Sequence, residues 1–175
     1  MTERTNKGLV IWLTGLSGAG KSTLAVRLAE WLAARGLPVE RLDGDVLRGR
    51  FPDTGFTRRE RDEHIRRVGF MASLLEKHGV AVVCSFISPY RRARREVRDM
   101  CHRFVEVYVR ASVEACEARD VKGLYARARA GQIANFTGLD DPYEPPEKPE
   151  LIVDTDRQDV DQSLAMITAY LERLL

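Results

Sequence analysis

Five short apolar runs, separated by amphipathic stretches, constrain the fold of this chain of 175 residues more than any other feature of its sequence. Three of the runs are almost continuous in Val, Ile, Leu or Phe, which is typical of strands buried on both faces. Strands that alternate with helices predict a parallel sheet with helices on both sides. The predicted strands are residues 9–14, 38–43, 80–86, 104–109 and 150–155.

Helical periodicity fills most of the stretches between these runs. In the first stretch, one face is apolar and carries Leu24, Leu28, Trp31 and Leu32. Gly36 would end that helix. The predicted helices are residues 22–35, 58–77, 90–102 and 157–174. The length is typical of one domain, so we expect a single three-layer α/β/α domain over residues 1–175, with a flexible segment at residues 1–7.

Residues 131–149 break this alternation, because they hold four prolines and two glycines. A segment of this length without secondary structure inside a compact domain is usually functional or disordered. Its aromatic residues, Phe136 and Tyr143, favour an ordered loop that faces a ligand. We therefore expect residues 120–149 to form a lid and an acceptor-binding loop.

The segment GLSGAGKST follows the first predicted strand and opens the first predicted helix. It fits the pattern G-x-x-x-x-G-K-[ST], in which backbone N–H groups point at phosphate oxygens and the helix N-terminus adds partial positive charge. Lys21 would reach the β- and γ-phosphates of a nucleoside triphosphate, and the Ser22 hydroxyl would bind Mg²⁺. The predicted nucleotide contacts are Gly15, Leu16, Ser17, Gly18, Ala19, Gly20, Lys21, Ser22 and Thr23.

Several classes of enzyme share such a loop. A GTPase would carry an N-K-x-D motif to read the base, and this sequence has none. A motor ATPase usually needs more chain and partner subunits. The length therefore favours a small-molecule kinase of the P-loop type, which passes the γ-phosphoryl group to a hydroxyl of a bound acceptor.

The segment LDGDVLR ends the second predicted strand, and ligands of such sheets gather at the carboxyl ends of the strands. Asp43 and Asp45 could accept a proton from the attacking hydroxyl or hold a water bound to Mg²⁺. Arg48 could bind an anionic acceptor. The structural alternative is a turn in which an aspartate caps the next helix, and it stays open for Asp43.

The third predicted strand ends in FISPYRR. Ser88 followed by Pro89 predicts a helix start, with serine as the N-cap and proline at the first helical position. A functional alternative is that this helix N-terminus, with Arg91 or Arg92, binds an anion on the acceptor.

Charge and cysteine content narrow the classes further. The net charge of +2 argues against nucleic-acid binding, although residues 58–67 and 91–98 are rich in arginine, and we interpret both segments as solvated helix faces. The three cysteines include no CxxC pair, which argues against a disulfide framework or a zinc site and favours the cytoplasm. No apolar run reaches about 18 residues, so we expect no membrane span.

Six segments, in this order, resemble adenylyl-sulfate kinase: GLSGAGKST, LDGDVLR, IRRVGF, FISPYR, CEARDVKGLYARARAG and NFTGLDDPYEPPEKPEL. The resemblance runs from about Gly8 to Thr155. It implies a P-loop kinase fold with a five-stranded parallel sheet. It also implies transfer of the γ-phosphoryl group of ATP, with Mg²⁺, to the 3′-hydroxyl of adenosine 5′-phosphosulfate in sulfate assimilation.

The resemblance also implies individual roles. Asp45 would be the carboxylate nearest the acceptor 3′-hydroxyl, and Asp43 would support it or Mg²⁺. In that family the serine at Ser88 is often described as a phosphoserine intermediate, but direct transfer between two bound ligands needs only positioning and charge. The other implied contacts are Arg48 and Arg61 on the phosphosulfate, Phe56 and Phe136 around the acceptor adenine, Ile87, Ser88, His64, Lys122 and Thr137 along the acceptor, and Arg119 on the ATP base.

Three departures from the family pattern fall on the acceptor side. Val46 and His64 stand where the family usually has asparagine, and the segment from Arg48 to Phe56 is one residue shorter. His64 is either an ordinary exposed helix residue or a hydrogen-bond donor that attracts sulfate more strongly when protonated. The alternatives to the leading function are a kinase for another hydroxyl acceptor and a degenerate nucleotide-binding regulatory domain. The resemblance also implies a homodimer and association or fusion with an ATP sulfurylase.

Overall fold

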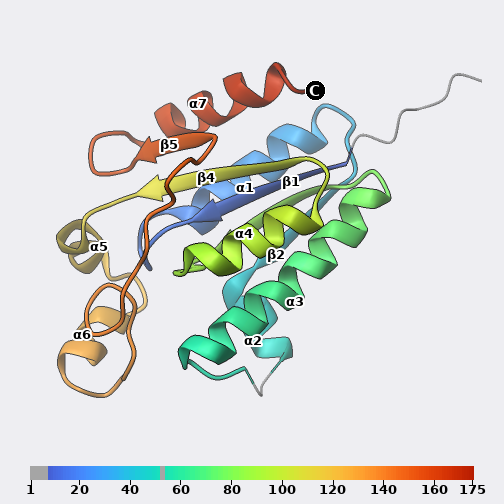
Figure 1. Cartoon of the computed structure of the whole chain (residues 1–175). Coiled ribbons are helices and arrows are strands. Elements are labelled where there is room, and N and C mark those ends of the chain that lie inside the picture. The colour runs from blue at the N-terminus through green and yellow to red at the C-terminus, as the bar shows by residue number, and fades with distance from the viewer. Residues whose placement is uncertain (1–7, 52–53) are drawn as a thin grey trace, which may run out of the picture.

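A computed structural model describes residues 8–51 and 54–175, so the prediction for residues 1–7 lies outside the described residues (Figure 1). The five predicted strands are all present, each within one residue of its predicted ends. They form one parallel sheet in the order β2-β3-β1-β4-β5. The strands are β1 Leu9–Thr14, β2 Val39–Asp43, β3 Ala81–Phe86, β4 Phe104–Arg110 and β5 Leu151–Asp154.

Seven helices occur in the described residues, and the four long ones are those that the periodicity predicts. The other three have six or seven residues, too few for a clear apolar period. Each follows a local backbone signal: Asp43 caps one, Ser112 caps another, and Gly123 begins the third in the left-handed region with φ of 64°. The helices are α1 Lys21–Ala33, α2 Gly44–Arg50, α3 Arg58–Lys77, α4 Arg91–Met100, α5 Val113–Arg119, α6 Leu124–Arg129 and α7 Val160–Glu172.

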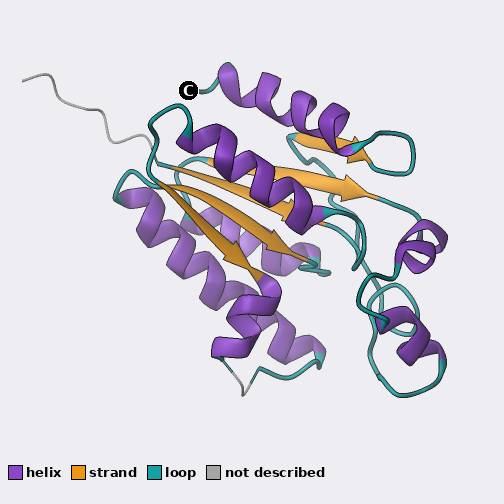
Figure 2. Ribbon diagram, turned by 180° about the vertical axis from the view of Figure 1, so that it is seen from behind, coloured by secondary structure: helices purple, strands orange, loops and turns teal. Residues whose placement is uncertain are grey.

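The sheet is buried on both faces, which confirms the three-layer α/β/α prediction. Side chains alternate along β1: Ile11 packs on the face covered by α1 and α7, and Trp12 packs on the face covered by α3 and α4 (Figure 2). Both are fully buried. No helix in residues 8–51 or 54–175 is long and apolar enough to cross a membrane.

The strand order brings three predicted motifs together at the carboxyl ends of the strands. In the register of the central strands, Thr14 lies opposite Phe86, and Asp43 lies opposite Ser85. The loops that follow β1, β2 and β3 therefore leave the sheet side by side. The helices α5 and α6 and the loop before β5 extend beyond the same edge (Figure 1).

Close packing of α3 on α4 yields a stability prediction. A Cβ atom at Gly69 would lie 2.5 Å from Cγ2 of Val97, whereas one at Gly49 in α2 would meet nothing within 4 Å. Gly69→Ala should lower the free energy of unfolding by about 1–3 kcal/mol through overpacking. Gly49→Ala, the matched control, should be neutral or stabilising by up to about 1 kcal/mol. Urea titration of both variants measures the difference, and equal stabilities would contradict the packing argument.

Candidate active site

The glycine-rich segment forms a loop between β1 and α1 that side chains hold from outside. Gly15 admits no side chain, because a Cβ atom there would lie 2.3 Å from the carbonyl oxygen of Val109. The Tyr125 hydroxyl donates to the carbonyl oxygen of Ser17 at 3.0 Å, and the Thr155 hydroxyl donates to that of Ala19 at 3.0 Å. These two hydrogen bonds fix the loop through its carbonyl groups, while its binding of phosphate stays a prediction.

Arg119 also contacts this loop. Its Nη1 donates to the carbonyl oxygen of Gly18 at 3.3 Å and to Oγ1 of Thr155 at 3.2 Å. Arg119 therefore lies beside the phosphate loop, while its contact with the ATP base stays a prediction.

Lys21 is the first residue of α1, and its side chain bends back over the loop. Nζ donates to the carbonyl oxygen of Leu16 at 2.6 Å, and the residue is buried. Burial lowers the pKa of Lys21 to about 8. The phosphate oxygens of a nucleotide in the loop would be stronger acceptors for this amine than the carbonyl group it now binds.

Asp43 connects four elements of the site. Its Oδ2 accepts hydrogen bonds from Ser22 at 3.0 Å and Ser85 at 2.8 Å, and its Oδ1 accepts from the backbone N–H groups of Asp45 and Val46. Partial burial would raise the pKa of Asp43, but these hydrogen bonds outweigh it and hold the pKa below its ordinary value. One oxygen therefore caps α2, as the structural alternative predicts, and the other contacts Ser22. The roles of Asp43 as a proton acceptor or a Mg²⁺ ligand stay predictions.

Asp45 lies in the first turn of α2 and is largely exposed. It forms an ion pair with Lys122, which lies between α5 and α6. The predicted proton acceptor and the lysine predicted to bind the acceptor are thus together, and their contact connects the lid to α2. The neighbouring Val46 is 60% exposed and makes no side-chain hydrogen bond by its nature.

The two arginines that are predicted to bind the phosphosulfate donate hydrogen bonds to backbone carbonyl groups in this structure. Arg48 donates from Nη1 to the carbonyl oxygens of Thr54 and Gly55, at 3.2 and 3.1 Å. Arg61 is buried and donates from Nε to the carbonyl oxygen of Phe56 at 2.8 Å. Its other nitrogens bind residues 135 and 137 of the acceptor loop. Arg61 is therefore not part of a solvated helix face.

The two predicted stacking residues differ in exposure. Phe56 is 57% exposed, and the Arg48 guanidinium lies 4.5 Å from the centre of its ring. Phe136 is 8% exposed and packs edge-on against Tyr125, with ring centres 4.9 Å apart. The contact of both rings with an acceptor base stays a prediction.

The structure overturns the prediction that Ser88 caps α4. The N-cap is Tyr90 and the helix begins at Arg91, while Ser88 has a φ of 40°, in the left-handed region. The Ser88 hydroxyl is buried, where it accepts from Nε1 of Trp12 and donates to Oγ1 of Thr14, both at 3.0 Å. These two bonds leave the hydroxyl poorly placed for a phosphoserine intermediate.

At the N-terminus of α4, the place predicted for an anion of the acceptor is taken by carboxylates of the chain itself. The backbone N–H of Arg91 donates to Oε2 of Glu144 at 2.9 Å, and the Arg91 side chain forms an ion pair with Glu147 at 3.1 Å. Arg92 forms an ion pair with Glu96 on its own helix. The interpretation of this N-terminus as an acceptor site is therefore wrong in this structure.

His64 is 2% exposed, so the interpretation as an exposed helix residue is wrong. Neither ring nitrogen has a hydrogen-bond partner among the described residues. Burial, reinforced by the positive charges of Arg48 and Arg67, lowers the pKa of His64 to about 4. The imidazole is therefore neutral near pH 7, which argues against attraction of sulfate by a protonated ring.

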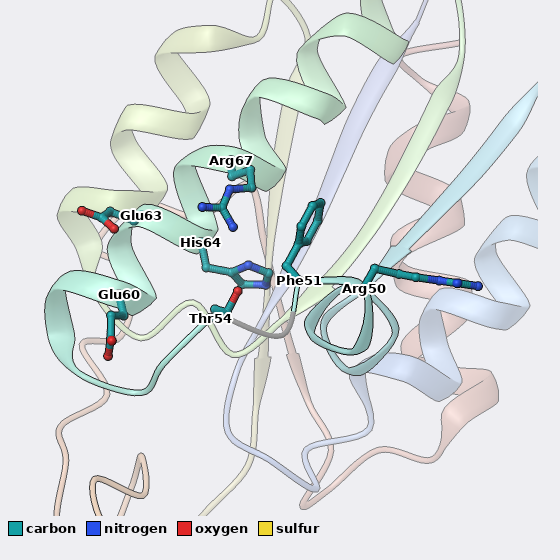
Figure 3. Close-up of a pocket in the computed structure, with 7 residues that line it drawn as sticks. All are labelled: Arg50, Phe51, Thr54, Glu60, Glu63, His64 and Arg67. Atoms are coloured by element: carbon teal, nitrogen blue, oxygen red, sulfur yellow. The ribbon is translucent and has the colours of Figure 1, made fainter.

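His64 lines a pocket of about 410 Å³ between α2 and α3, which the sequence did not predict (Figure 3). Besides the two ring nitrogens of His64, Oγ1 of Thr54 is a third buried polar atom of this pocket without a partner among the described residues. The sequence signals were a histidine in an arginine-rich helical segment, where the family usually has asparagine, and the shorter segment from Arg48 to Phe56. The other residues that line the pocket are Arg50, Phe51, Glu60, Glu63 and Arg67.

Comparison with known proteins gives one consistent result. Residues 7–154 match the family described as adenylylsulphate kinase. The curated adenylyl-sulfate kinase of Halothermothrix orenii is 52% identical over 97% of this chain and 92% of its own length. That of Gloeothece citriformis is 54% identical over 96% of each chain.

Solved structures agree with these relatives. The APS kinase CysC of Mycobacterium tuberculosis in complex with AMPPNP and APS superposes with a TM-score of 0.90, at 39% identity, and 95% of this chain and 98% of that chain are covered. A gluconokinase from Sinorhizobium meliloti, with a TM-score of 0.61 and 20% identity, shares the fold alone.

The buried imidazole yields a pH prediction. The pKa of His64 in the folded protein, about 4, lies below its ordinary value of 6.5. In the pH window between these two values, the unfolded chain is protonated at His64 and the folded protein is not. Stability is therefore lost as the pH falls through the window. From about pH 7.5 to about pH 4.5, the wild type should lose about 2–3 kcal/mol of unfolding free energy relative to His64→Asn. Urea unfolding of both proteins at both pH values checks this, and parallel pH profiles would contradict it.

Proposed function

The chain belongs to the adenylylsulphate kinase family, and we propose that it transfers the γ-phosphoryl group of ATP to the 3′-hydroxyl of adenosine 5′-phosphosulfate. The products are ADP and 3′-phosphoadenosine 5′-phosphosulfate. The observation that carries the proposal is the arrangement at one edge of the sheet. There Ser22 of α1 binds Asp43, and the loops that follow β1, β2 and β3 leave the sheet side by side.

The donor side follows from the loop. The triphosphate of ATP would lie in the cradle of residues 15–23, with Lys21 on the β- and γ-phosphates and Arg119 beside the base. Ser22 and Asp43 fit a divalent cation, because they present a hydroxyl and an ionised carboxylate 3.0 Å apart. Mg²⁺ held there would neutralise charge that develops on the β- and γ-oxygens.

The acceptor side supplies the nucleophile. The 3′-oxygen forms a bond to the γ-phosphorus as the bond to the bridging oxygen of ADP breaks, and Asp45 takes the proton of the hydroxyl. For this step the ion pair between Asp45 and Lys122 has to break. The ammonium group of Lys122 can then bind the acceptor phosphate. Phe56 and Phe136 would hold the adenine, because stacking on rings suits a flat base.

The proposed contacts with the phosphosulfate involve positions where this chain departs from the family pattern. Arg48 uses a single nitrogen on backbone, so further guanidinium donors remain to bind the anion. Neutral His64 can donate one hydrogen bond, as the asparagine amide of the family would. Arg61 acts mainly by fixing the backbone at Phe56 and the side chain of Thr137. Ile87 and Ser88 would line the remaining side of the acceptor site.

Several wider assignments belong to the same proposal. We take residues 1–175 as one kinase domain with residues 120–149 as its lid and acceptor loop. The thiols of Cys84, Cys101 and Cys116 are free, which suits a reducing compartment such as the cytoplasm. A homodimer and an association with an ATP sulfurylase remain proposals. Gel filtration with and without that enzyme tests them.

An acceptor comparison tests the function directly. ADP formation from ATP should accelerate strongly with adenosine 5′-phosphosulfate and much less with AMP, because AMP lacks the sulfate. A reaction without acceptor gives the background. Equal rates with all three would exclude the proposed acceptor. Acceleration by another hydroxyl compound alone would favour a kinase for that compound.

Two variants should separate donor from acceptor functions. Lys21→Ala should reduce kcat by about 100-fold or more, because charge on the transferring group loses its stabiliser. Phe136→Ala should raise the acceptor KM by about 5- to 100-fold through lost stacking and leave the ATP KM nearly unchanged. Steady-state kinetics with each substrate varied in turn measure both effects. An unchanged acceptor KM in Phe136→Ala would refute the stacking assignment.

A further inference from the structure

One face of α4 contacts the acceptor loop through arginines. Arg91, Arg94 and Arg98 are three and four residues apart, so they lie along one side of the helix. The interpretation of residues 91–98 as a solvated face is wrong for this side, since Arg94 is 3% exposed. We call these three residues the anchoring face of α4.

Arg94 is at the centre of that face and bonds to three different segments. Nε donates to Oε1 of Glu106 on β4 at 2.8 Å, and Nη2 donates to the carbonyl oxygen of Glu144 in the acceptor loop at 2.6 Å. Nη1 donates to the carbonyl oxygen of Ser88, after β3. The planar guanidinium spans all three, because its donors point in fixed, divergent directions.

The flanking arginines hold the rest of the loop. Arg98 binds both carboxylate oxygens of Glu150 at 2.7 and 2.8 Å, just before β5. Arg91 donates from Nε to the carbonyl oxygen of Pro145 at 2.7 Å. The loop segment that follows Tyr143 is therefore fastened to α4 at several points.

The loop and Ser88 are also connected on the other side. Thr14 donates its single hydroxyl hydrogen to the carbonyl oxygen of Ile87 at 2.8 Å and accepts from Ser88. Its remaining lone pair accepts from the Tyr143 hydroxyl at 2.9 Å. Arg94 thus closes a ring of contacts that includes the backbone of Ser88 and the loop at residues 143 and 144.

We propose that Arg94 is a positioning residue for the acceptor: it sets the acceptor loop at a fixed distance from the Ile87–Ser88 segment. This inference rests on the proposed function, because both segments are predicted to line the acceptor. The phosphate loop shares no hydrogen bond with Arg94, so ATP binding should not depend on it. Loss of a merely structural ion pair would instead lower the stability and change the KM values of both substrates alike.

The test uses Arg94→Lys in the full chain. Lysine keeps the positive charge beside Glu106, but its single ammonium group cannot span both carbonyl oxygens. The acceptor KM should rise by about 10-fold or more, since charge-assisted hydrogen bonds to the loop are lost. The ATP KM should stay within about 2-fold, because no donor-side contact changes. The matched control is Arg92→Ala on the exposed side of α4, which should behave as the wild type.

Each outcome has one meaning. A selective rise of the acceptor KM, with the ATP KM within about 2-fold of the wild-type value, supports the proposal, even where the melting temperature falls because buried hydrogen bonds are lost. Equal loss for both substrates, or no change in either, overturns it. If Arg94→Lys shows no cooperative thermal transition, Glu106→Gln is measured in the same way and decides by the same criterion. Failure of the wild type to use adenosine 5′-phosphosulfate would overturn the proposed function, and that result is distinct from a null result in the variants alone.

Discussion

The carboxylate of Asp43 is the interaction on which the arrangement of the site most depends. It lies at the end of β2, caps α2, and binds the hydroxyls of Ser22 at the start of α1 and Ser85 at the end of β3. A neutral side chain would bind these donors more weakly, because charge-assisted hydrogen bonds are about twice as strong as neutral ones. The start of α1, the start of α2 and the end of β3 are thereby held together by one carboxylate.

The extent to which the sequence predicts this structure varies with length scale. Nearly continuous apolar runs predicted β1 and β3, and helical periodicity predicted α3, because burial of whole faces dominates local preferences. The short helix α2 was not predicted, although its cap was considered at Asp43. Ser88 shows the opposite case, since Ser-Pro predicts a cap, yet bonds to Trp12 and Thr14 hold that serine in the core. Contacts between residues more than 70 positions apart leave no local pattern.

The arginines illustrate the same limit. Within a helical segment, Arg61, Arg94 and Arg92 look alike, and the natural expectation for each is solvent. The structure buries the first two, and each guanidinium donates hydrogen bonds to backbone carbonyl groups of distant segments. His64 is a different case, since its side chain on α3 lines the pocket beside α2 and has no polar partner among the described residues. Charge patterning alone cannot separate these cases.

The anchored acceptor loop has a consequence for the thermodynamics of recognition. Ordering one residue of a chain costs about 1–2 kcal/mol of conformational entropy, and a disordered loop would incur this cost each time a ligand bound. Here Arg61, Arg94 and Arg98 hold the loop and its end at Glu150 through contacts within the chain itself. Its ordering is thus part of folding, and more of the free energy of each acceptor contact is available as affinity.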